Sequence, residues 1–172
     1  IGNLSRAARW NITGNTAAGI KSLSKVLNLK GKVLPLSEDN VVLMGIMNDG
    51  EKIEGEHNIT EYKSGIKDIY YKTPPKINPE VIKEIKEADM IILSMGSLYT
   101  SVICNLISDD VVRAIDESKG KILYVCNMFT QPGETDDYTV SDHIKALNNH
   151  LGTRKIDTVI VNDGKIPKEF IL

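Results

Sequence analysis

The sequence predicts an α/β protein with a mostly parallel sheet, and three observations along the chain support that fold class. From residue 79 onward, short apolar runs alternate with amphipathic segments. Those runs, at 90–94, 121–125 and 157–161, are apolar throughout, which is typical of strands covered on both faces. By contrast, the segment 32–72 is β-rich and punctuated by turns, which indicates an antiparallel flap at the edge of that sheet.

The first thirty residues are predicted to form two helices, because apolar residues recur at three- and four-residue spacing on both sides of a break at Gly14-Asn15. The chain begins at Ile1 rather than at a methionine, and its opening residues already resemble the middle of a domain. We therefore expect residues 1–172 to form one α/β domain that is part of a larger one.

Local signals place the remaining elements. The triplet 48–50 (Asn-Asp-Gly) between the β-rich runs 41–47 and 51–59 predicts a hairpin. Pro79 marks a helix start, with a buried face built from Val81, Ile82, Ile85 and Ala88. Three further helices are predicted at 100–108, 109–118 and 139–152.

Composition narrows the class of function. The chain has 172 residues, a net charge of −2 and no basic stripe, which argues against nucleic-acid binding. No apolar run reaches the roughly 20 residues that span a bilayer, and no signal peptide is visible. Cys104 and Cys126 follow apolar neighbours without a CxxC spacing, so we expect free core thiols and a cytoplasmic protein.

Two loops are the candidate ligand-binding segments, because ligands of such sheets bind beyond the carboxyl ends of the strands. In the loop 94–101, Gly96 permits a tight turn, and Ser97, Thr100 and Ser101 lie at a predicted helix start, where free amides attract anions. The alternative is that Thr100 or Ser101 is only the helix cap.

The loop 127–137 places Asn127, Thr130 and Gln131 directly after a buried strand, with a Pro-Gly turn before Glu134. Glu134 is the candidate catalytic residue, because an exposed carboxylate can accept sugar hydroxyls or act as acid or base. The alternative is a surface loop with solvated acids. If the two strands are neighbours, both loops line one cleft.

The helix after this loop begins with a predicted capping box, Thr139-x-x-Asp142, and buries a stripe of Val140, Ile144, Leu147 and Leu151. His143 and His150 are seven residues apart, which is too far for an i, i+4 zinc pair, so no metal site is predicted. We expect His143 to be the functional histidine because it is near the loop. GxGxxG, P-loop and GxSxG motifs are absent.

Several strings resemble the bacterial gluconeogenesis factors, which are related to the 2-phospho-L-lactate transferases. They are GSLYTSVICNL from Gly96, YVCNMFTQPGETDDYTVSDHIKAL from Tyr124 and the pattern ID-x-VIVN from Ile156. Weaker likeness extends through residues 2–4, 12–14 and 31–35, and therefore covers nearly the whole chain. The string CN-x-x-TQPGETD, from Cys126 to Asp136, is the most specific part.

The resemblance implies a Rossmann-like three-layer fold, a cytoplasmic location and a cleft that binds a nucleotide-sugar, here a UDP-sugar. It also implies a role in gluconeogenic growth, cell-wall synthesis and cell shape. Residues and resemblance together give these ligand-binding positions: Asn3, Gly96, Ser97, Leu98, Thr100, Asn127, Thr130, Gln131, Glu134 and Thr135.

Two departures from the family pattern matter. The family's glycine-rich N-terminal loop and acidic segment are not in this sequence, so any divalent metal would be held by residues that this chain lacks. Ser94-Met95-Gly96 replaces a Gly-Pro-Gly turn. Three hypotheses stay open: a nucleotide-sugar sensor without chemistry, a phospholactate- or phosphoryl-type transferase, and an interaction protein. The oligomeric state, including a homo-oligomer, is open as well.

Overall fold

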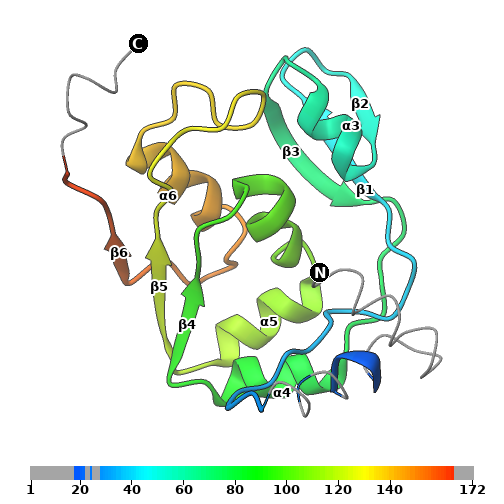
Figure 1. Ribbon diagram of the computed structural model, residues 1–172, viewed down its shortest axis with the longest axis vertical. Helices are drawn as coiled ribbons and strands as arrows, with labels where there is room; N and C mark the ends of the chain where they lie inside the picture. The colour runs from blue at the N-terminus through cyan, green and yellow to red at the C-terminus, as the bar shows by residue number, and fades with distance from the viewer. Residues whose placement is uncertain (1–17, 22–23, 25–27, 165–172) are drawn as a thin grey trace.

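Figure 1 shows the computed structural model, which describes residues 18–21, 24 and 28–164. Of the first thirty residues, which are predicted to form two helices, residues 18–21, 24 and 28–30 fall within this range; residues 18–21 and 24 are helical and residues 28–30 are not. Asn3 lies outside the described residues.

A parallel sheet of three strands forms the centre of the fold, in the order β4 (Met90–Leu93), β5 (Lys121–Val125) and β6 (Thr158–Ile160). Leu93 pairs with Tyr124, so the carboxyl ends of β4 and β5 lie side by side. The helices α4 (Pro79–Glu87), α5 (Asp109–Glu117) and α6 (Val140–Asn148) alternate with these strands. The α/β class with a parallel sheet is therefore confirmed.

The helix starts follow from their capping residues. Asn78 accepts a hydrogen bond from the amide of Glu80 (2.9 Å) ahead of Pro79, the first residue of α4. At α6 the predicted capping box is present, since Thr139 Oγ1 accepts from the Asp142 amide and the Asp142 carboxylate accepts from the Thr139 amide. Val140 corrects the predicted stripe: it is 39% exposed, because as the first helical residue it precedes the turn that packs on the sheet.

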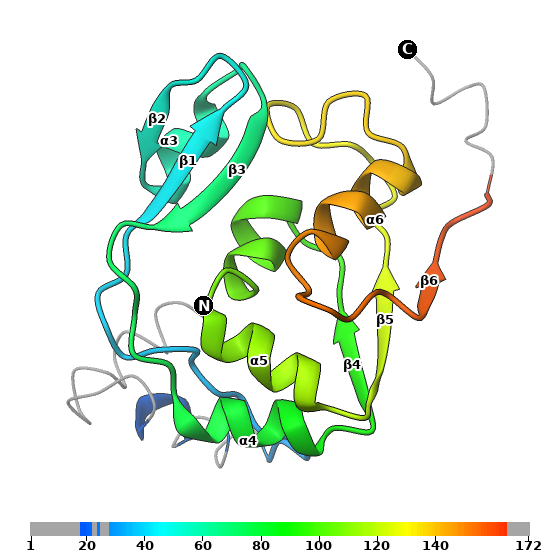
Figure 2. The ribbon, with the colours of Figure 1, turned by 180° about the vertical axis from the view of Figure 1, so that it is seen from behind.

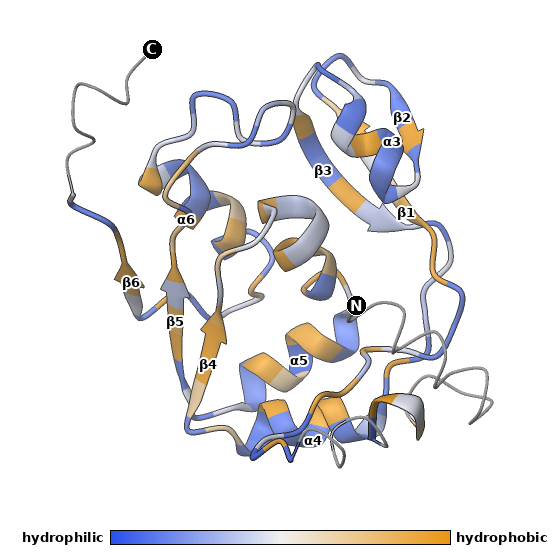
Figure 3. Cartoon of the chain, viewed as in Figure 1, coloured by the Kyte–Doolittle hydropathy of each residue, from blue (hydrophilic) through white to orange (hydrophobic). Residues whose placement is uncertain are grey.

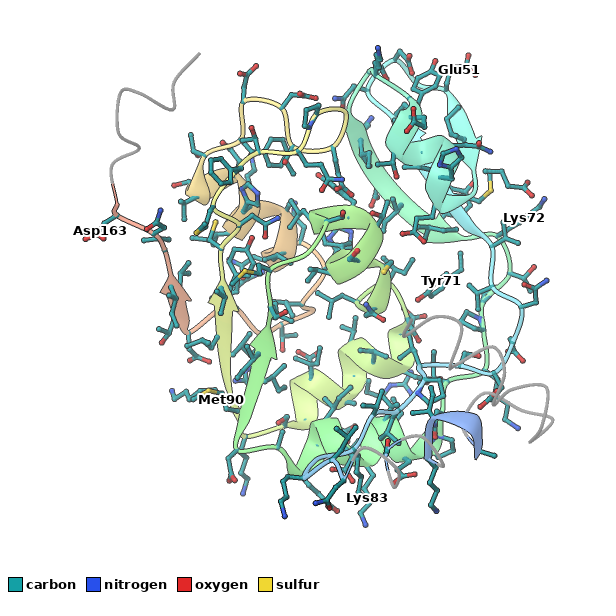
Figure 4. All side chains as sticks on the ribbon, in the orientation of Figure 1. Glu51, Tyr71, Lys72, Lys83, Met90 and Asp163 are labelled. Carbon is teal, nitrogen blue, oxygen red and sulfur yellow. The ribbon has the colours of Figure 1, made fainter. Side chains whose placement is uncertain are left out.

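The two faces of the parallel sheet differ. Ile122 and Tyr124 of β5 are buried in the core with residues of α5 and α6, on the side where Figures 1 and 2 show the helices. On the opposite face Met90 and Ile92 are 50% and 55% exposed, and Figure 4 shows Met90 extending away from α5. The described residues therefore cover one face of the sheet. No described helix is long and apolar enough to cross a membrane.

The predicted flap is a separate antiparallel sheet with the order β2 (Lys52–Glu54), β1 (Leu43–Met47) and β3 (Ile66–Tyr71). The hairpin at residues 48–50 is confirmed, with Gly50 at a φ of 92°. The expected strand over 51–59 is wrong beyond Glu54, because the short helix α3 (Glu56–Glu61) follows it. Gly55, at a φ of 90°, turns the chain, and Ile59 is then buried over β1.

The helix predicted for residues 100–108 is replaced by a π-helical turn, η1 (Leu98–Val102), and a 3₁₀ turn, η2 (Ile103–Asn105). Hydrogen bonds from other segments accompany the irregular backbone. The Tyr71 hydroxyl of β3 donates to the carbonyl of Cys104, and the amides at the start of η1 are bonded to Glu134. A carbonyl that accepts a hydrogen bond from Tyr71 is less available to accept one from a backbone amide in the next turn of a regular helix.

Candidate functional site

The two predicted loops meet at the carboxyl edge of the parallel sheet. Asn127 Nδ2 donates to the carbonyl of Gly96 (2.7 Å), and Ser97 Oγ donates to Gln131 Oε1 (2.9 Å). Figure 3 shows the loop beyond β5 as mainly hydrophilic and β4 as hydrophobic. Both loops therefore lie at one edge of the sheet, as predicted, while a single cleft lined by both loops and their ligand contacts remain predictions.

Glu134 is the strongest tie between these loops, and its position corrects the expected exposed turn. The side chain is 1% exposed. Its Oε1 accepts from the amides of Tyr99 (3.1 Å) and Thr100 (2.9 Å). The amides that the sequence offered to a ligand anion are thus bonded to a carboxylate of the protein itself, as expected for a negative charge at a helix start. Its Oε2 is buried and has no described partner.

Glycine shapes the second loop. Gly133 has a φ of 81°, and a Cβ at that position would lie 3.1 Å from the Thr60 carbonyl of α3. The predicted turn thus brings the loop against the flap. Thr135 is 1% exposed and closes the turn by accepting the Gln131 amide at Oγ1 (2.8 Å).

A cavity of about 290 Å³ lies between the flap and this loop, and we call it the Glu134 cavity. The flap contributes Lys63 and Ser64, and the loop contributes Glu134, Asp136 and Tyr138. The unpartnered Glu134 Oε2 makes this a place for a hydrogen-bond donor such as a hydroxyl or for a cationic group.

A second cavity, of about 280 Å³, lies beyond the ends of β5 and β6 at the start of α6, and we call it the His143 cavity. Its lining includes Asn127, Thr130, Phe129 and His143. The imidazole is 3% exposed, and its Nδ1 is 2.9 Å from the Thr139 carbonyl. Its Nε2 is buried and has no hydrogen-bond partner among the described residues.

Tyr138 lines both cavities, so they adjoin. Its hydroxyl lies 2.9 Å from that of Tyr99, and its ring meets His143 edge to face, with centroids 5.4 Å apart. Burial, and then the hydrogen bond with the Tyr138 hydroxyl, raise the pKa of Tyr99 well above its usual range.

Other predicted site residues have different surroundings. Leu98 is in the hydrophobic core, and Thr100 lines a separate cavity of about 390 Å³ together with Tyr71 and Cys104. Contact of either residue with a ligand stays a prediction. Lys63, Ser64 and Tyr138 were missed, because nothing in the sequence indicates that the flap folds against the loop.

The cysteine prediction is confirmed, since Cys104 and Cys126 are both free. Burial raises the pKa of the Cys104 thiol to about 11. Over residues 18–21, 24 and 28–164, no three His, Cys, Asp or Glu side chains are grouped to hold a metal ion. His150 instead bonds Asp68 of the flap through Nε2 (3.2 Å).

Known proteins with similar sequences match nearly the whole of this chain. The family model described as "2-phospho-L-lactate transferase CofD" matches residues 1–172. The gluconeogenesis factor of Bacillus subtilis (strain 168) is 47% identical over 171 residues, which are 98% of this chain and 54% of that protein. The gluconeogenesis factor of Halalkalibacterium halodurans is 43% identical over 164 residues, covering 94% and 51%.

A crystal structure of a protein from Bacillus halodurans superposes with a TM-score of 0.90 at 41% identity, covering 96% of this chain and 54% of that one. The chain spans about half the length of the relatives that it matches. The resemblance carried by the string from Cys126 to Asp136 is thus confirmed, and the chain belongs to the 2-phospho-L-lactate transferase CofD family, together with the gluconeogenesis factors.

Proposed function

We propose that this chain is the ligand-binding part of a cytoplasmic regulatory factor that binds a nucleotide-sugar, with a UDP-sugar as the ligand. The observation that carries the proposal is the pair of adjoining cavities at the carboxyl edge. Each is lined by a residue with a buried acceptor atom that has no described partner, Glu134 Oε2 in one and His143 Nε2 in the other, and Ser64 Oγ of the Glu134 cavity lining is buried without a partner as well. An unsatisfied buried acceptor costs free energy, which a ligand donor would recover.

The chemistry of the cavities suits an elongated polar ligand. The Glu134 cavity combines a carboxylate oxygen with Ser64 and Lys63, a set that fits sugar hydroxyls beside an anionic group. At the start of α6, the amides of Val140 and Ser141 have no acceptor among the described residues, and a helix start of this kind favours phosphate.

The regulatory part of the proposal comes from the relatives, whose printed name is gluconeogenesis factor. We extend it to a role in growth on gluconeogenic carbon, in peptidoglycan synthesis and in cell shape. A sensor of nucleotide-sugars would connect these processes, because such sugars lie between carbon supply and the cell wall.

A transferase is the second candidate, and the observation in its favour is the description of the family model as a 2-phospho-L-lactate transferase. In this case a nucleotide-activated substrate would occupy the same cavities. Within the described part of the chain, no three His, Cys, Asp or Glu side chains are grouped to hold a metal ion for such a reaction.

Calorimetry on the intact protein separates these candidates. The titrants are UDP-glucose, UDP-N-acetylglucosamine, GDP and a deazaflavin, and each mixture is then assayed for turnover. Saturable UDP-sugar binding without product formation is the expected result. Product formation from a nucleotide-activated substrate would favour the transferase, and no binding of any UDP-sugar would contradict the proposal.

A further inference from the structure

We infer that the His143 cavity binds a heteroaromatic base that carries a ring N–H, and that His143 Nε2 accepts a hydrogen bond from that N–H. The inference rests on the proposed nucleotide-sugar function and assigns the base of the ligand to this cavity. The sugar and its hydroxyls are then left for the Glu134 cavity.

The tautomer of His143 fixes which partner it needs. A backbone carbonyl can only accept a hydrogen bond, so the 2.9 Å contact with Thr139 requires the proton on Nδ1. In the neutral ring Nε2 is then an acceptor. The ring is held between Tyr124, stacked at 6.5 Å, and Tyr138, at 5.4 Å, which fixes the direction of its lone pair. The complement of a fixed, buried acceptor is a donor.

The size and rim of the cavity suit a single ring system. Its volume of about 280 Å³ is small for a pocket that encloses a whole nucleotide-sugar, since ligand pockets run from roughly 300 to 1,000 Å³. Phe129 and Met128 line it and are 66% and 62% exposed, so an aromatic face and a flexible apolar side chain are free to cover a base. Asn162 also lines the cavity, and its side-chain amide can donate to a base carbonyl.

The position of α6 extends the inference to the phosphates. Thr139 and Val140 line the His143 cavity, so a base bound there lies beside the open amides of the first helical turn. A diphosphate attached to that base would meet the open amides of Val140 and Ser141 beside the Asp142 carboxylate, which already offsets part of the positive end of this nine-residue helix. Tyr138 lines both cavities, so a ligand that occupied both would have to pass its side chain.

The arrangement selects among bases. Uracil and guanine carry a ring N–H, whereas the corresponding ring nitrogens of cytosine and adenine are acceptors. A cytosine or adenine would place two acceptors against each other in a buried position. Sites built around a hydrogen bond reject analogues that lack the donor strongly, because the site's own polar atom is left unpaired.

The test combines a ligand change with a matched pair of variants, measured by calorimetry on the intact protein. UDP-glucose is compared with its N3-methyl analogue, in which the ring N–H is replaced. In His143→Asn the side-chain amide can still donate to the Thr139 carbonyl in place of Nδ1, but nothing stands at the Nε2 position. In His143→Gln an amide oxygen can stand near that position and accept. His150→Asn is the control, because His150 also bonds an i−4 carbonyl but directs Nε2 to Asp68.

The expected result is a loss of about 10-fold or more in wild-type affinity on N3-methylation, the equivalent of one hydrogen bond in a buried site. His143→Asn should bind UDP-glucose about 10-fold more weakly and should no longer discriminate against the methyl group, whereas His143→Gln should recover part of both effects. His150→Asn should behave as wild type. Spectra of ¹⁵N-histidine in the wild-type protein give an independent readout, in which the Nε2 resonance of His143 should move with UDP-glucose and not with the methylated analogue.

An equal penalty for N3-methylation in wild type and His143→Asn would overturn the inference and leave the proposed function standing, because UDP-glucose would still bind. An unchanged Nε2 resonance under saturating UDP-glucose would overturn it too, even if His143→Asn failed to fold. If wild-type protein bound no nucleotide at all, the proposed function would fail first.

Discussion

The Glu134 cavity and the His143 cavity contain the same kind of feature, a buried acceptor without a described partner, but the two acceptors are attached to the fold differently. Oε1, the other oxygen of Glu134, accepts hydrogen bonds from two backbone amides of η1 and thereby joins two loops from neighbouring strands. Nδ1, the other nitrogen of His143, bonds the carbonyl of Thr139 at the start of its own helix. Changing Glu134 therefore disturbs the scaffold and the site together, whereas His143 can be altered at one atom with its helix contact preserved.

Replacing Glu134 should give the largest effect on stability. Glu134→Ala removes a carboxylate that accepts two buried amides, and hydrogen bonds to charged groups are worth about 1.5–3 kcal/mol each. We expect the free energy of unfolding to fall by about 3 kcal/mol or more in urea titrations followed by circular dichroism. Glu134→Gln is the matched control. It keeps one oxygen for the two amides, and should lose about half as much.

A loss below about 0.5 kcal/mol for Glu134→Ala would contradict the role of Glu134 as the tie between the loops, since changes of that size are typical of exposed positions. It would restore the expectation from sequence that Glu134 occupies an exposed turn.

Gly133 tests whether the second loop needs its contact with the flap. Gly133→Ala introduces a side chain at a φ of 81° and a Cβ 3.1 Å from the Thr60 carbonyl, so it should cost about 2–3 kcal/mol. Gly50→Ala separates the two causes, because Gly50 has a φ of 92° but nothing within 4 Å of an added Cβ, and it should cost only about 1–2 kcal/mol. Equal urea midpoint shifts for the two variants would argue that the loop does not press on α3.

The smallest expected effect concerns the start of α6 and depends on pH. Hydrogen bonds from the side chain and then the backbone of Thr139 hold the pKa of Asp142 below its ordinary value of 3.8. Because the unfolded chain binds this proton more readily, the stabilising contribution is complete above pH 3.8 and is lost as the pH falls through the folded-state pKa. The melting temperature of the wild type should therefore exceed that of Asp142→Asn by a smaller margin as the pH is lowered from 7 into the acid range. An advantage that grew on acidification would be inconsistent with the capping box.

Local signals predicted most of the scaffold. Asn78-Pro79 and Thr139-x-x-Asp142 satisfy backbone groups within a few residues, so the starts of α4 and α6 follow from sequence alone. The apolar runs became the three parallel strands, although the predicted cover on both faces is present on one face only among the described residues, since Met90 and Ile92 are 50% and 55% exposed.

The site was predicted only in outline, because its details depend on contacts between distant segments. The sequence placed the two loops at one edge, but the burial of Glu134 requires the amides of Tyr99 and Thr100, 35 and 34 residues away. Likewise α3 packs its Ile59 over Gly45 of β1, and η2 is tied to the flap through the hydrogen bond from Tyr71 to Cys104. Periodicity reports on a helix or strand in isolation and cannot predict such pairings.

A crystal structure of the intact protein with a bound UDP-sugar tests the central claim most directly. The account predicts the base in the His143 cavity with its ring nitrogen within about 3.2 Å of His143 Nε2, and a sugar hydroxyl at a similar distance from Glu134 Oε2. A UDP-sugar bound away from the carboxyl ends of β4 and β5, or bound there with both of these atoms still unpartnered, would contradict it.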